Sequence, residues 1–248
     1  MEKKTAFITG AGSGIGRETA NVLASKSMNV IVADINLENA EETVRSLKEA
    51  GGEGIAVYCD VASLKSVAEA VKKSLSHYET IDVLVNNAGW DKVGPFLDND
   101  PNIWKKLIDI NLMGHIYTSK EILPVMIHNG KGKVINIASD AGRVGSSGEA
   151  VYSAAKGGVI AFTKTIAREM ARYNINVNCV CPGPADTPLF VEIAGDNRKL
   201  AEALKKAIPF KRLAKPSDVA GAVAYFASEE ADYITGQTLS VSGGLTMS

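Results

Sequence analysis

The chain has 248 residues, with 27 Lys and Arg against 28 Asp and Glu, so its formal net charge is −1. This near-neutral charge gives no electrostatic footprint for nucleic acid or an anionic membrane surface, and 46% hydrophobic residues exclude a disordered chain. No apolar run approaches the roughly 18 residues of a membrane span, and the N-terminal run is shorter than a signal-peptide core, so we expect a cytoplasmic protein.

Short, β-branched apolar runs alternate with longer segments of helical period along the sequence. The predicted strands are residues 5–9, 29–34, 55–59, 83–85, 133–138, 176–180 and 239–241. The predicted helices are residues 15–27, 37–50, 64–77, 102–127, 151–173 and 216–226. This alternation indicates a parallel sheet covered by helices on both faces. We therefore predict an α/β fold: one Rossmann-type, doubly wound parallel sheet of about seven strands, in a single domain spanning 1–248.

The segment 182–215 reads as irregular. An insertion beyond the C-terminal end of a strand lies where a doubly wound sheet forms its ligand crevice. We therefore predict a mobile substrate loop at about 184–212 rather than a second domain. Pro124 is expected to kink the last turn of the helix predicted at 102–127.

Cysteine and histidine are sparse. The three cysteines, Cys59, Cys179 and Cys181, have the wrong number and spacing for a disulfide framework. Cys179 and Cys181 share one face of a predicted strand, where two small buried residues are a simpler interpretation than part of a zinc site. The three histidines form no metal-binding pair. We expect no metal.

A glycine-rich turn follows the first predicted strand and opens the first predicted helix. In Thr9-Gly10-Ala11-Gly12-Ser13-Gly14-Ile15-Gly16, Gly10 would permit a tight turn, Gly14 the approach of a pyrophosphate, and Gly16 close helix packing. Free N–H groups and the helix dipole favour an anion there. The turn predicts a dinucleotide, contacted by Gly10, Ser13, Gly14, Ile15 and Gly16.

Asp34 ends the second predicted strand, about 20 residues after Gly14. A carboxylate at this place accepts hydrogen bonds from the adenosine ribose hydroxyls and repels a 2′-phosphate. No Arg or Lys flanks Asp34, and Ser13 adds no cation to the glycine turn. The sequence therefore predicts NAD as the cofactor, with a helix N-cap as the alternative role of Asp34.

Tyr152 and Lys156 are four residues apart, so a helix presents both side chains on one face. Ser139 follows the strand predicted at 133–138. With these residues the whole chain resembles the short-chain dehydrogenase/reductase family. The motifs that carry the resemblance, in the family's order, are the glycine turn at 9–16, Asp60-Val61, Asn86-Asn87-Ala88-Gly89, Asn111, Ser139, Tyr152/Lys156 and Pro182-Gly183.

The resemblance implies a catalytic set of Asn111, Ser139, Tyr152 and Lys156. Tyr152 would be the general acid/base at the alcohol or carbonyl oxygen, and Lys156 and a cationic nicotinamide would lower its pKa from about 10. Lys156 would also hold the nicotinamide ribose, and Ser139 would hydrogen-bond to the substrate oxygen. Asn111, in a helix, would position a water between Lys156 and solvent. Ala138 replaces a second Ser found in many members.

Further dinucleotide contacts are implied by the same resemblance. Asp60 and Val61 would touch adenine, and Thr187 would meet the carboxamide. Asn86 is expected to support the sheet instead. The implied cofactor-binding residues outside the glycine turn and Asp34 are Asp60, Val61, Asn87, Ala88, Gly89, Tyr152, Lys156, Pro182, Gly183 and Thr187.

Three segments after strand ends, 90–96, 140–151 and 184–212, should select the substrate. They resemble the branch of the family that oxidises 2-hydroxycyclohexane-1-carbonyl-CoA, a β-hydroxy acyl-CoA, to its β-keto thioester. In that interpretation Trp90 walls the alicyclic ring, and Arg143 or the lysines at 205, 206 and 211 meet the CoA phosphates. The candidate substrate residues are Trp90, Asp140, Arg143 and Gly145.

Each of these assignments has a rival. Trp90 could be a packing residue, Asp140 and Glu149 could be caps rather than gates, and the cations could be ordinary surface charge. The enzymatic rivals are a 3-oxoacyl-carrier-protein reductase and a cyclic polyol or sugar dehydrogenase. A non-catalytic dinucleotide-binding regulator is the rival from another class. The family resemblance also implies a homotetramer, built on the helices predicted at 102–127 and 151–173.

Overall fold

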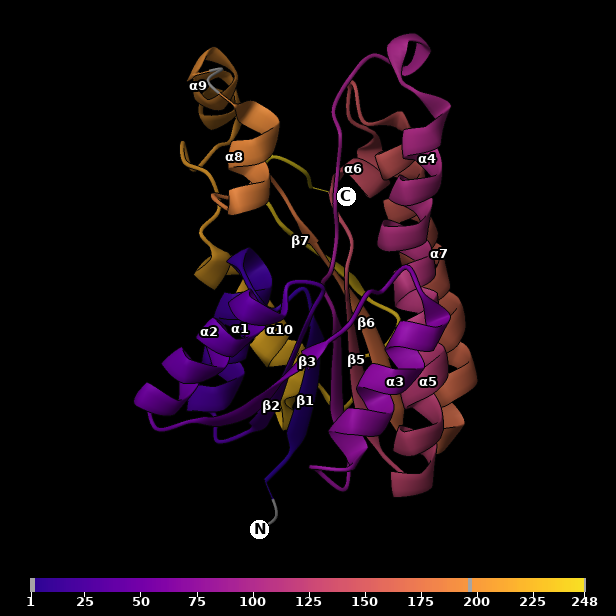
Figure 1. Cartoon of the computed structure of the whole chain (residues 1–248). Helices are drawn as coiled ribbons and strands as arrows, with labels where there is room; N and C mark the ends of the chain where they lie inside the picture. Colours follow the sequence, from indigo (N-terminus) through magenta and orange to yellow (C-terminus); the bar gives the residue numbers. More distant parts are fainter. Residues whose placement is uncertain (1–2, 196–197, 248) are drawn as a thin grey trace.

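Seven parallel strands form one sheet in the computed structural model, which describes residues 3–195 and 198–247. Their order is β3-β2-β1-β4-β5-β6-β7 (Figure 1). They are β1 (Thr5–Thr9), β2 (Asn29–Asp34), β3 (Glu53–Tyr58), β4 (Val83–Asn86), β5 (Gly132–Ile137), β6 (Ile175–Pro182) and β7 (Thr238–Val241). The predicted single-domain, doubly wound α/β fold is confirmed. The strand order reverses between β1 and β4, so the ligand crevice is expected at their carboxyl ends.

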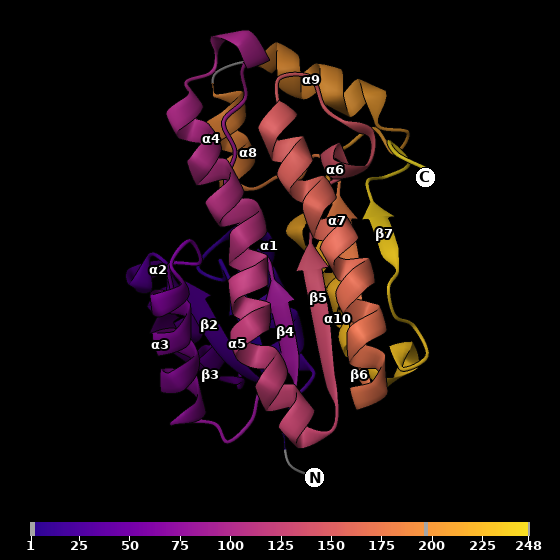
Figure 2. The same cartoon turned by 90° about the vertical axis from the view of Figure 1, so that its right-hand side faces the viewer.

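Helices cover both faces of the sheet (Figures 1 and 2). One layer is formed by α1 (Gly14–Ser25), α2 (Leu37–Glu49) and α10 (Pro216–Ala227). The other is formed by α3 (Leu64–Leu75), α5 (Gly114–Asn129) and α7 (Ala150–Met170). Side-chain caps start α2 and α3, where Asn36 and Ser63 accept from backbone N–H groups three residues later. None of the helices in the described ranges is long and apolar enough to cross a membrane.

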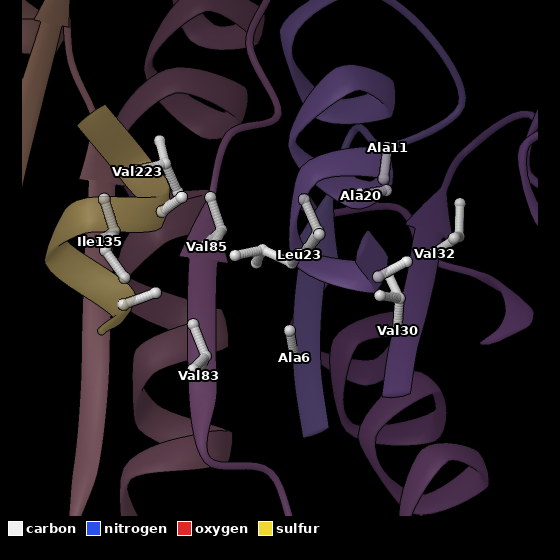
Figure 3. Close-up of a cluster of buried hydrophobic side chains, with 14 of the residues drawn as sticks. Ala6, Ala11, Ala20, Leu23, Val30, Val32, Val83, Val85, Ile135 and Val223 are labelled. Carbon is white, nitrogen blue, oxygen red and sulfur yellow. The ribbon is translucent and has the colours of Figure 1, made fainter. Parts of the chain in front are cut away.

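Two apolar layers hold the helices to the sheet. On the first face, Leu23 of α1 and Val223 of α10 pack over Val85 and Ile135 of the central strands (Figure 3). The opposite face has a second cluster, in which Phe7 of β1 meets buried residues of α3 and α5. Because the central strands are buried on both faces, they read as nearly continuous apolar runs.

Polar groups between β4, β5 and the second helix layer fix the position of that layer against the sheet. Asn86 Nδ2 donates to Asn136 Oδ1 at 2.8 Å, and Asn86 Oδ1 accepts from the Thr118 hydroxyl of α5. Asn136 Nδ2 donates in turn to Thr163 Oγ1 of α7 at 2.9 Å. These groups are buried, so each bond also removes a desolvation cost. Asn86 thus supports the sheet, as expected.

The helix predicted at 102–127 is three elements. α4 (Pro101–Ile108) leads into a π-helical turn (Asp109–Met113) and then into α5, which continues past Pro124 to Asn129. The prediction of a single uninterrupted helix over 102–127 is therefore wrong. An apolar period cannot reveal one residue of extra winding, and such π-turns occur mostly at functional sites.

The segment predicted as irregular at 182–215 contains two helices, α8 (Pro188–Ala194) and α9 (Arg198–Ala207). Thr187 starts α8, since its hydroxyl accepts from Phe190 N at 3.2 Å and Pro188 occupies the first helical position. Residues 196–197 of the predicted loop lie outside the described residues. Figure 1 shows α8 and α9 beyond the carboxyl ends of the strands, across from α4 and the short α6 (Ala141–Val144).

Candidate active site

Ser139, Tyr152 and Lys156 meet where β5 ends. Lys156 Nζ lies 5.7 Å from the centroid of the Tyr152 ring, one helical turn away on α7. The Ser139 side chain, just after β5, hydrogen-bonds to the Tyr152 phenol. Lys156 Nζ also donates to the Ile137 carbonyl at 2.9 Å, which holds the buried ammonium at the strand end. The structure thus brings Ser139 together with Tyr152 and Lys156, the two residues that the helical spacing paired.

Asn111 lies in the π-helical turn and faces the same place. Its Nδ2 donates to the Trp90 carbonyl at 2.6 Å and to the Leu107 carbonyl at 3.0 Å, and its Oδ1 accepts from Trp90 N at 3.2 Å. A Cβ added to Gly89 would lie 3.1 Å from Asn111 Oδ1 and 3.5 Å from Lys156 Nζ. Gly89 therefore lies between the side chains of Asn111 and Lys156. Because glycine has no Cβ, these two side chains can approach each other closely.

The glycine turn after β1 is closed by packing. A Cβ on Gly16 would lie 2.2 Å from the Gly10 carbonyl oxygen and 2.5 Å from Asn87 Nδ2, so no side chain fits there. Asn87, just after β4, donates from Nδ2 to the carbonyls of Thr9 at 2.9 Å and Gly10 at 3.2 Å. Gly14 has φ +53° and faces Thr187. This leaves bare backbone at the N-terminus of α1, a geometry suited to a pyrophosphate.

Asp34 is tied to that turn. Its Oδ2 accepts from Gly12 N at 2.8 Å and its Oδ1 from Asn36 N at 2.8 Å. The N-cap of α2 is Asn36, so the alternative role for Asp34 is wrong. Arg17, which the sequence analysis did not consider, donates to the Gly12 carbonyl and pairs with Glu42 at 2.9 Å. This nearby cation is therefore already paired with a carboxylate.

The remaining expected cofactor residues lie at or near the carboxyl ends of strands of the same sheet. Asp60 Oδ1 accepts from Ala62 N at 3.0 Å in the turn before α3, and Val61 is buried against Gly114. Pro182 ends β6, and Gly183 follows it, where an added Cβ would lie 2.9 Å from Ser242 Cβ. Ser13 is exposed, and Ile15 and Ala88 are half-buried. A crowded glycine turn, a ribose-side carboxylate and bare N–H groups together fit a nicotinamide dinucleotide.

Comparison with known proteins identifies the family. A family described as enoyl-(acyl carrier protein) reductase matches residues 10–246. A 3-oxoacyl-[acyl-carrier-protein] reductase from Synechocystis is 39% identical and covers 100% of this chain and 98% of its own. The chain belongs to the short-chain dehydrogenase/reductase family. It is an oxidoreductase of the class that acts on hydroxyl or keto groups with a nicotinamide dinucleotide.

Two other similar proteins of this family bear on the substrate and the cofactor. A cis-4-hydroxycyclohexanecarboxylate dehydrogenase from Sinomonas cyclohexanicum is 38% identical and covers 98% of this chain and 97% of its own. A crystal structure of an actinorhodin polyketide ketoreductase variant with NADPH superposes with a TM-score of 0.94 at 36% identity, covering 98% of this chain and 97% of that chain.

The pKa values of both Tyr152 and Lys156 are shifted from their usual values. Burial lowers the pKa of Lys156 to about 8. Burial, and then the charge of Asp91, raise the pKa of Tyr152 above its usual 10, against the opposing effect of the Ser139 hydrogen bond. The expectation that Lys156 and a bound cationic nicotinamide lower the Tyr152 pKa stays a prediction. The ammonium is directed at the Ile137 carbonyl, and desolvation of the phenol dominates.

His115 of α5 lies close to Lys156, a position that the sequence did not reveal. Its Nε2 is 3.3 Å from the Ile137 carbonyl oxygen, the atom that also accepts from Lys156. Burial, followed by the Lys156 charge, lowers the pKa of His115 to about 3, so the ring is neutral and donates to this carbonyl. His115 and Lys156 therefore hydrogen-bond to the same carbonyl oxygen, that of Ile137.

A second group missed by the sequence analysis is Asp91, which follows Trp90. It is 3% exposed, its Oδ1 accepts from Lys92 N at 2.7 Å, and its Oδ2 has no donor. The Glu149 carboxyl faces it. Burial, and then Glu149, raise the pKa of Asp91 to about 7. Two ionised carboxylates contain no donor, so this contact becomes a hydrogen bond only when one of them carries a proton.

The expected substrate residues divide into two kinds. Trp90 is half-buried, with Lys106 Nζ 3.8 Å from its ring centroid, and Gly145 is exposed at the end of α6. Asp140 is 5% exposed and accepts from Ser240 Oγ of β7. Arg143 NH1 donates to the same Oγ at 3.0 Å and to the Thr238 carbonyl at 3.3 Å. Asp140 and Arg143 therefore connect α6 to β7 through hydrogen bonds.

The lysines proposed for CoA phosphates lie on and after α9. Lys205 pairs with Glu202 at 3.0 Å, Lys206 is exposed, and Lys211 Nζ donates to the Lys206 carbonyl at 2.7 Å. Cys59, Cys179 and Cys181 are free and buried. Among the described residues, no group of three His, Cys, Asp or Glu side chains has the arrangement of a metal site.

Proposed function

We propose that the protein interconverts β-ketoacyl and β-hydroxyacyl thioesters with NAD(H). The observation that carries the cofactor choice is the Asp34 carboxylate on Gly12 N, where it would meet the ribose hydroxyls and repel a 2′-phosphate. Arg17, a cation close to this turn, is already paired with Glu42, which weakens any offset to that repulsion. The similar ketoreductase structure contains NADPH rather than NAD(H). The preference of this protein between the two cofactors is therefore the first property to measure.

Two substrates share this chemistry. The similar proteins favour 3-oxoacyl groups on a carrier protein, since several of them are reductases of that kind. The second candidate, 2-hydroxycyclohexane-1-carbonyl-CoA, is supported by the similarity to a cyclohexanecarboxylate dehydrogenase and by the half-buried Trp90 ring. Asp91 and Glu149 disfavour a further negative charge beside Tyr152, which supports a neutral thioester over a free acid.

The chain's own groups account for the proton and the oxygen. In reduction, Tyr152 donates its phenol proton to the carbonyl oxygen while Ser139 hydrogen-bonds to that oxygen as it gains charge. Lys156, fixed on the Ile137 carbonyl, would hold the nicotinamide ribose. A dinucleotide held by the glycine turn and Lys156 would supply the hydride that the carbonyl carbon accepts. Tyr152 then regains a proton from solvent, on the path where Asn111 and Lys156 flank Gly89.

A substrate panel tests this proposal. Acetoacetyl-CoA, 3-oxoacyl-carrier protein, 2-hydroxycyclohexane-1-carbonyl-CoA and free cyclic polyols are assayed with NAD(H) and with NADP(H). We expect thioesters to exceed polyols, and NADH to exceed NADPH by roughly tenfold or more in kcat/KM. A preference for polyols contradicts the thioester assignment, and a preference for NADPH contradicts the role of Asp34. NADH binding without turnover of any substrate would leave only the non-catalytic regulator.

We also propose a homotetramer built on α4–α5 and α7. Ile160 and Phe162 of α7 are half-buried in the single chain and lie on the helix layer that would be shared. Light scattering on a size-exclusion column gives the mass directly: four times 26.2 kDa supports the proposal, and a monomer refutes it.

A further inference from the structure

The short helix α6 begins directly after Ser139, the residue proposed to bind the substrate oxygen. Ser139 Oγ accepts from Ala141 N at 3.1 Å, and the Ser139 carbonyl accepts from Gly142 N at 3.0 Å. A hydroxyl that accepts from the backbone keeps its proton for donation, which is the direction that a substrate oxygen needs. The first turn of α6 therefore orients the Ser139 hydroxyl.

One side of α6 packs closely on the backbone of the catalytic helix α7. A Cβ added to Gly142 would lie 2.6 Å from the Lys156 backbone carbon and 2.7 Å from Gly157 N, so no side chain fits at Gly142. Figure 2 shows α6 beside the upper part of α7. A displacement of α6 would therefore change the distance between Ser139 and the Tyr152–Lys156 pair.

Polar side chains tie α6 to the edge strand β7 as well. Asp140 Oδ1 accepts from Ser240 Oγ, and the same Oγ accepts from Arg143 NH1 at 3.0 Å. Arg143 NH1 also donates to the Thr238 carbonyl at 3.3 Å. The backbone joins the same region to β6, since Asp140 N donates to the Pro182 carbonyl at 3.2 Å. Ser240 thus connects the side chains of Asp140 and Arg143 to β7.

Stability does not account for the carboxylate of Asp140. The residue is 5% exposed, and its Oδ2 has no hydrogen-bond donor in the part of the chain that the structure describes. A buried carboxylate oxygen without a donor costs free energy of folding. Asp140 stands at the N-cap position of α6, yet its side chain caps none of the N–H groups of that helix. The contact with Ser240 is therefore the interaction that needs an explanation.

We infer that Asp140, Arg143 and Ser240 form a positioning network that holds α6, and with it the Ser139 hydroxyl, where that hydroxyl stabilises charge on the substrate oxygen. A donor contributes to catalysis only where it meets the developing charge, and a shift of about 1 Å can cost a factor of roughly 100 in rate. The network places part of this control on β7, 100 residues from Asp140 in the chain. The inference rests on the proposed role of Ser139.

The test is a double-mutant cycle between Ser240 and Ser139, measured with NADH and the fastest thioester of the substrate panel. Ser240→Ala removes the hydroxyl that Asp140 and Arg143 share, so kcat should fall about tenfold. The KM for NADH should stay constant, because the change leaves the glycine turn intact. In a Ser139→Ala background, Ser240→Ala should cause no further loss, since it acts through the Ser139 hydroxyl. A merely structural effect would lower kcat in both backgrounds alike.

Two further variants make the cycle specific. Ser240→Thr keeps the hydroxyl and should retain the wild-type kcat. Thr238→Val is the matched control, because it removes a hydroxyl of the same strand that has no hydrogen-bond partner among the described residues, and it keeps the carbonyl that accepts from Arg143. The kcat of Thr238→Val should equal that of the wild type.

An unchanged kcat in folded Ser240→Ala overturns the inference, and so does a full further loss in the Ser139→Ala background or an equal loss in Thr238→Val. If circular dichroism shows that Ser240→Ala does not fold, Asp140→Ala decides by the same cycle and the same criteria. A wild-type rate in Ser139→Ala refutes the proposed role of Ser139 itself. A loss of about a hundredfold in Ser139→Ala beside an unchanged Ser240→Ala leaves that role standing and refutes only this inference.

Discussion

The cofactor crevice and the substrate side of the molecule are built in different ways. The crevice uses backbone from two adjacent strand ends: the glycine turn after β1, closed by Asn87 after β4. On the substrate side, segments far apart in sequence meet. Gly94 N donates to the Gly148 carbonyl, and Asp140 accepts a hydrogen bond from Ser240 Oγ. The glycine turn itself is a local pattern of the chain, whereas no local pattern links the loops that meet on the substrate side.

The largest expected effect tests the residue that both regions share. Tyr152→Phe removes the phenol proton but keeps the ring over Lys156, so turnover should fall about a thousandfold while NADH binding persists. Steady-state rates and NADH fluorescence titration measure the two properties separately. Retained turnover would show that another group acts as acid/base.

The second largest effect is expected from a substitution in the crowded glycine turn. Gly16→Ala puts a Cβ against the Gly10 carbonyl, so the free energy of unfolding should drop by about 3 kcal/mol and NADH affinity should fall with it. Gly221→Ala is the matched control, because Gly221 is also helical but has open space around its Cβ position. That change should be neutral or stabilise by up to about 1 kcal/mol. Equal urea midpoints for the two variants would disprove the close packing.

A smaller effect is expected at Asp34. Asp34→Asn keeps an oxygen for Gly12 N and removes the charge, so the kcat/KM ratio of NADPH to NADH should rise roughly tenfold. Glu38→Gln, an exposed change in the first turn of α2, should leave the ratio unaltered. If the ratio for Asp34→Asn also stays constant, the carboxylate does not discriminate between the cofactors.

What could be predicted from the sequence follows the same division. The strands and the Tyr152–Lys156 face follow from period and spacing, because these are local properties of the chain. The π-turn around Asn111 was missed because one residue of extra winding leaves the apolar pattern intact. α9 was missed although its apolar residues recur at helical spacing in Leu200–Ile208, a signal that was available. Asp91 gave no signal, since its neighbour Glu149 is distant in the chain.

The smallest predicted effect concerns His115, which binds the second helix layer to the strand end that anchors Lys156. Its folded-state pKa of about 3 lies below the ordinary 6.5, so between these values the unfolded chain takes up the proton more readily. Stability is therefore lost as the pH falls from 6.5 towards 3. His115→Gln keeps a donor for the Ile137 carbonyl but cannot titrate, so its melting temperature should fall less than that of the wild type between pH 7 and pH 5.

The exposed His128 of the same helix is the matched control for His115. His128→Gln should follow the wild-type melting curve at each pH, because this exposed side chain buries little surface on folding. If His115→Gln shows the same pH dependence as His128→Gln, the buried ring contributes nothing to acid sensitivity. A reduced dependence in His115→Gln alone would show that the anchor of the catalytic lysine depends on a neutral histidine, a coupling between α5 and α7 that no spacing within either helix reveals.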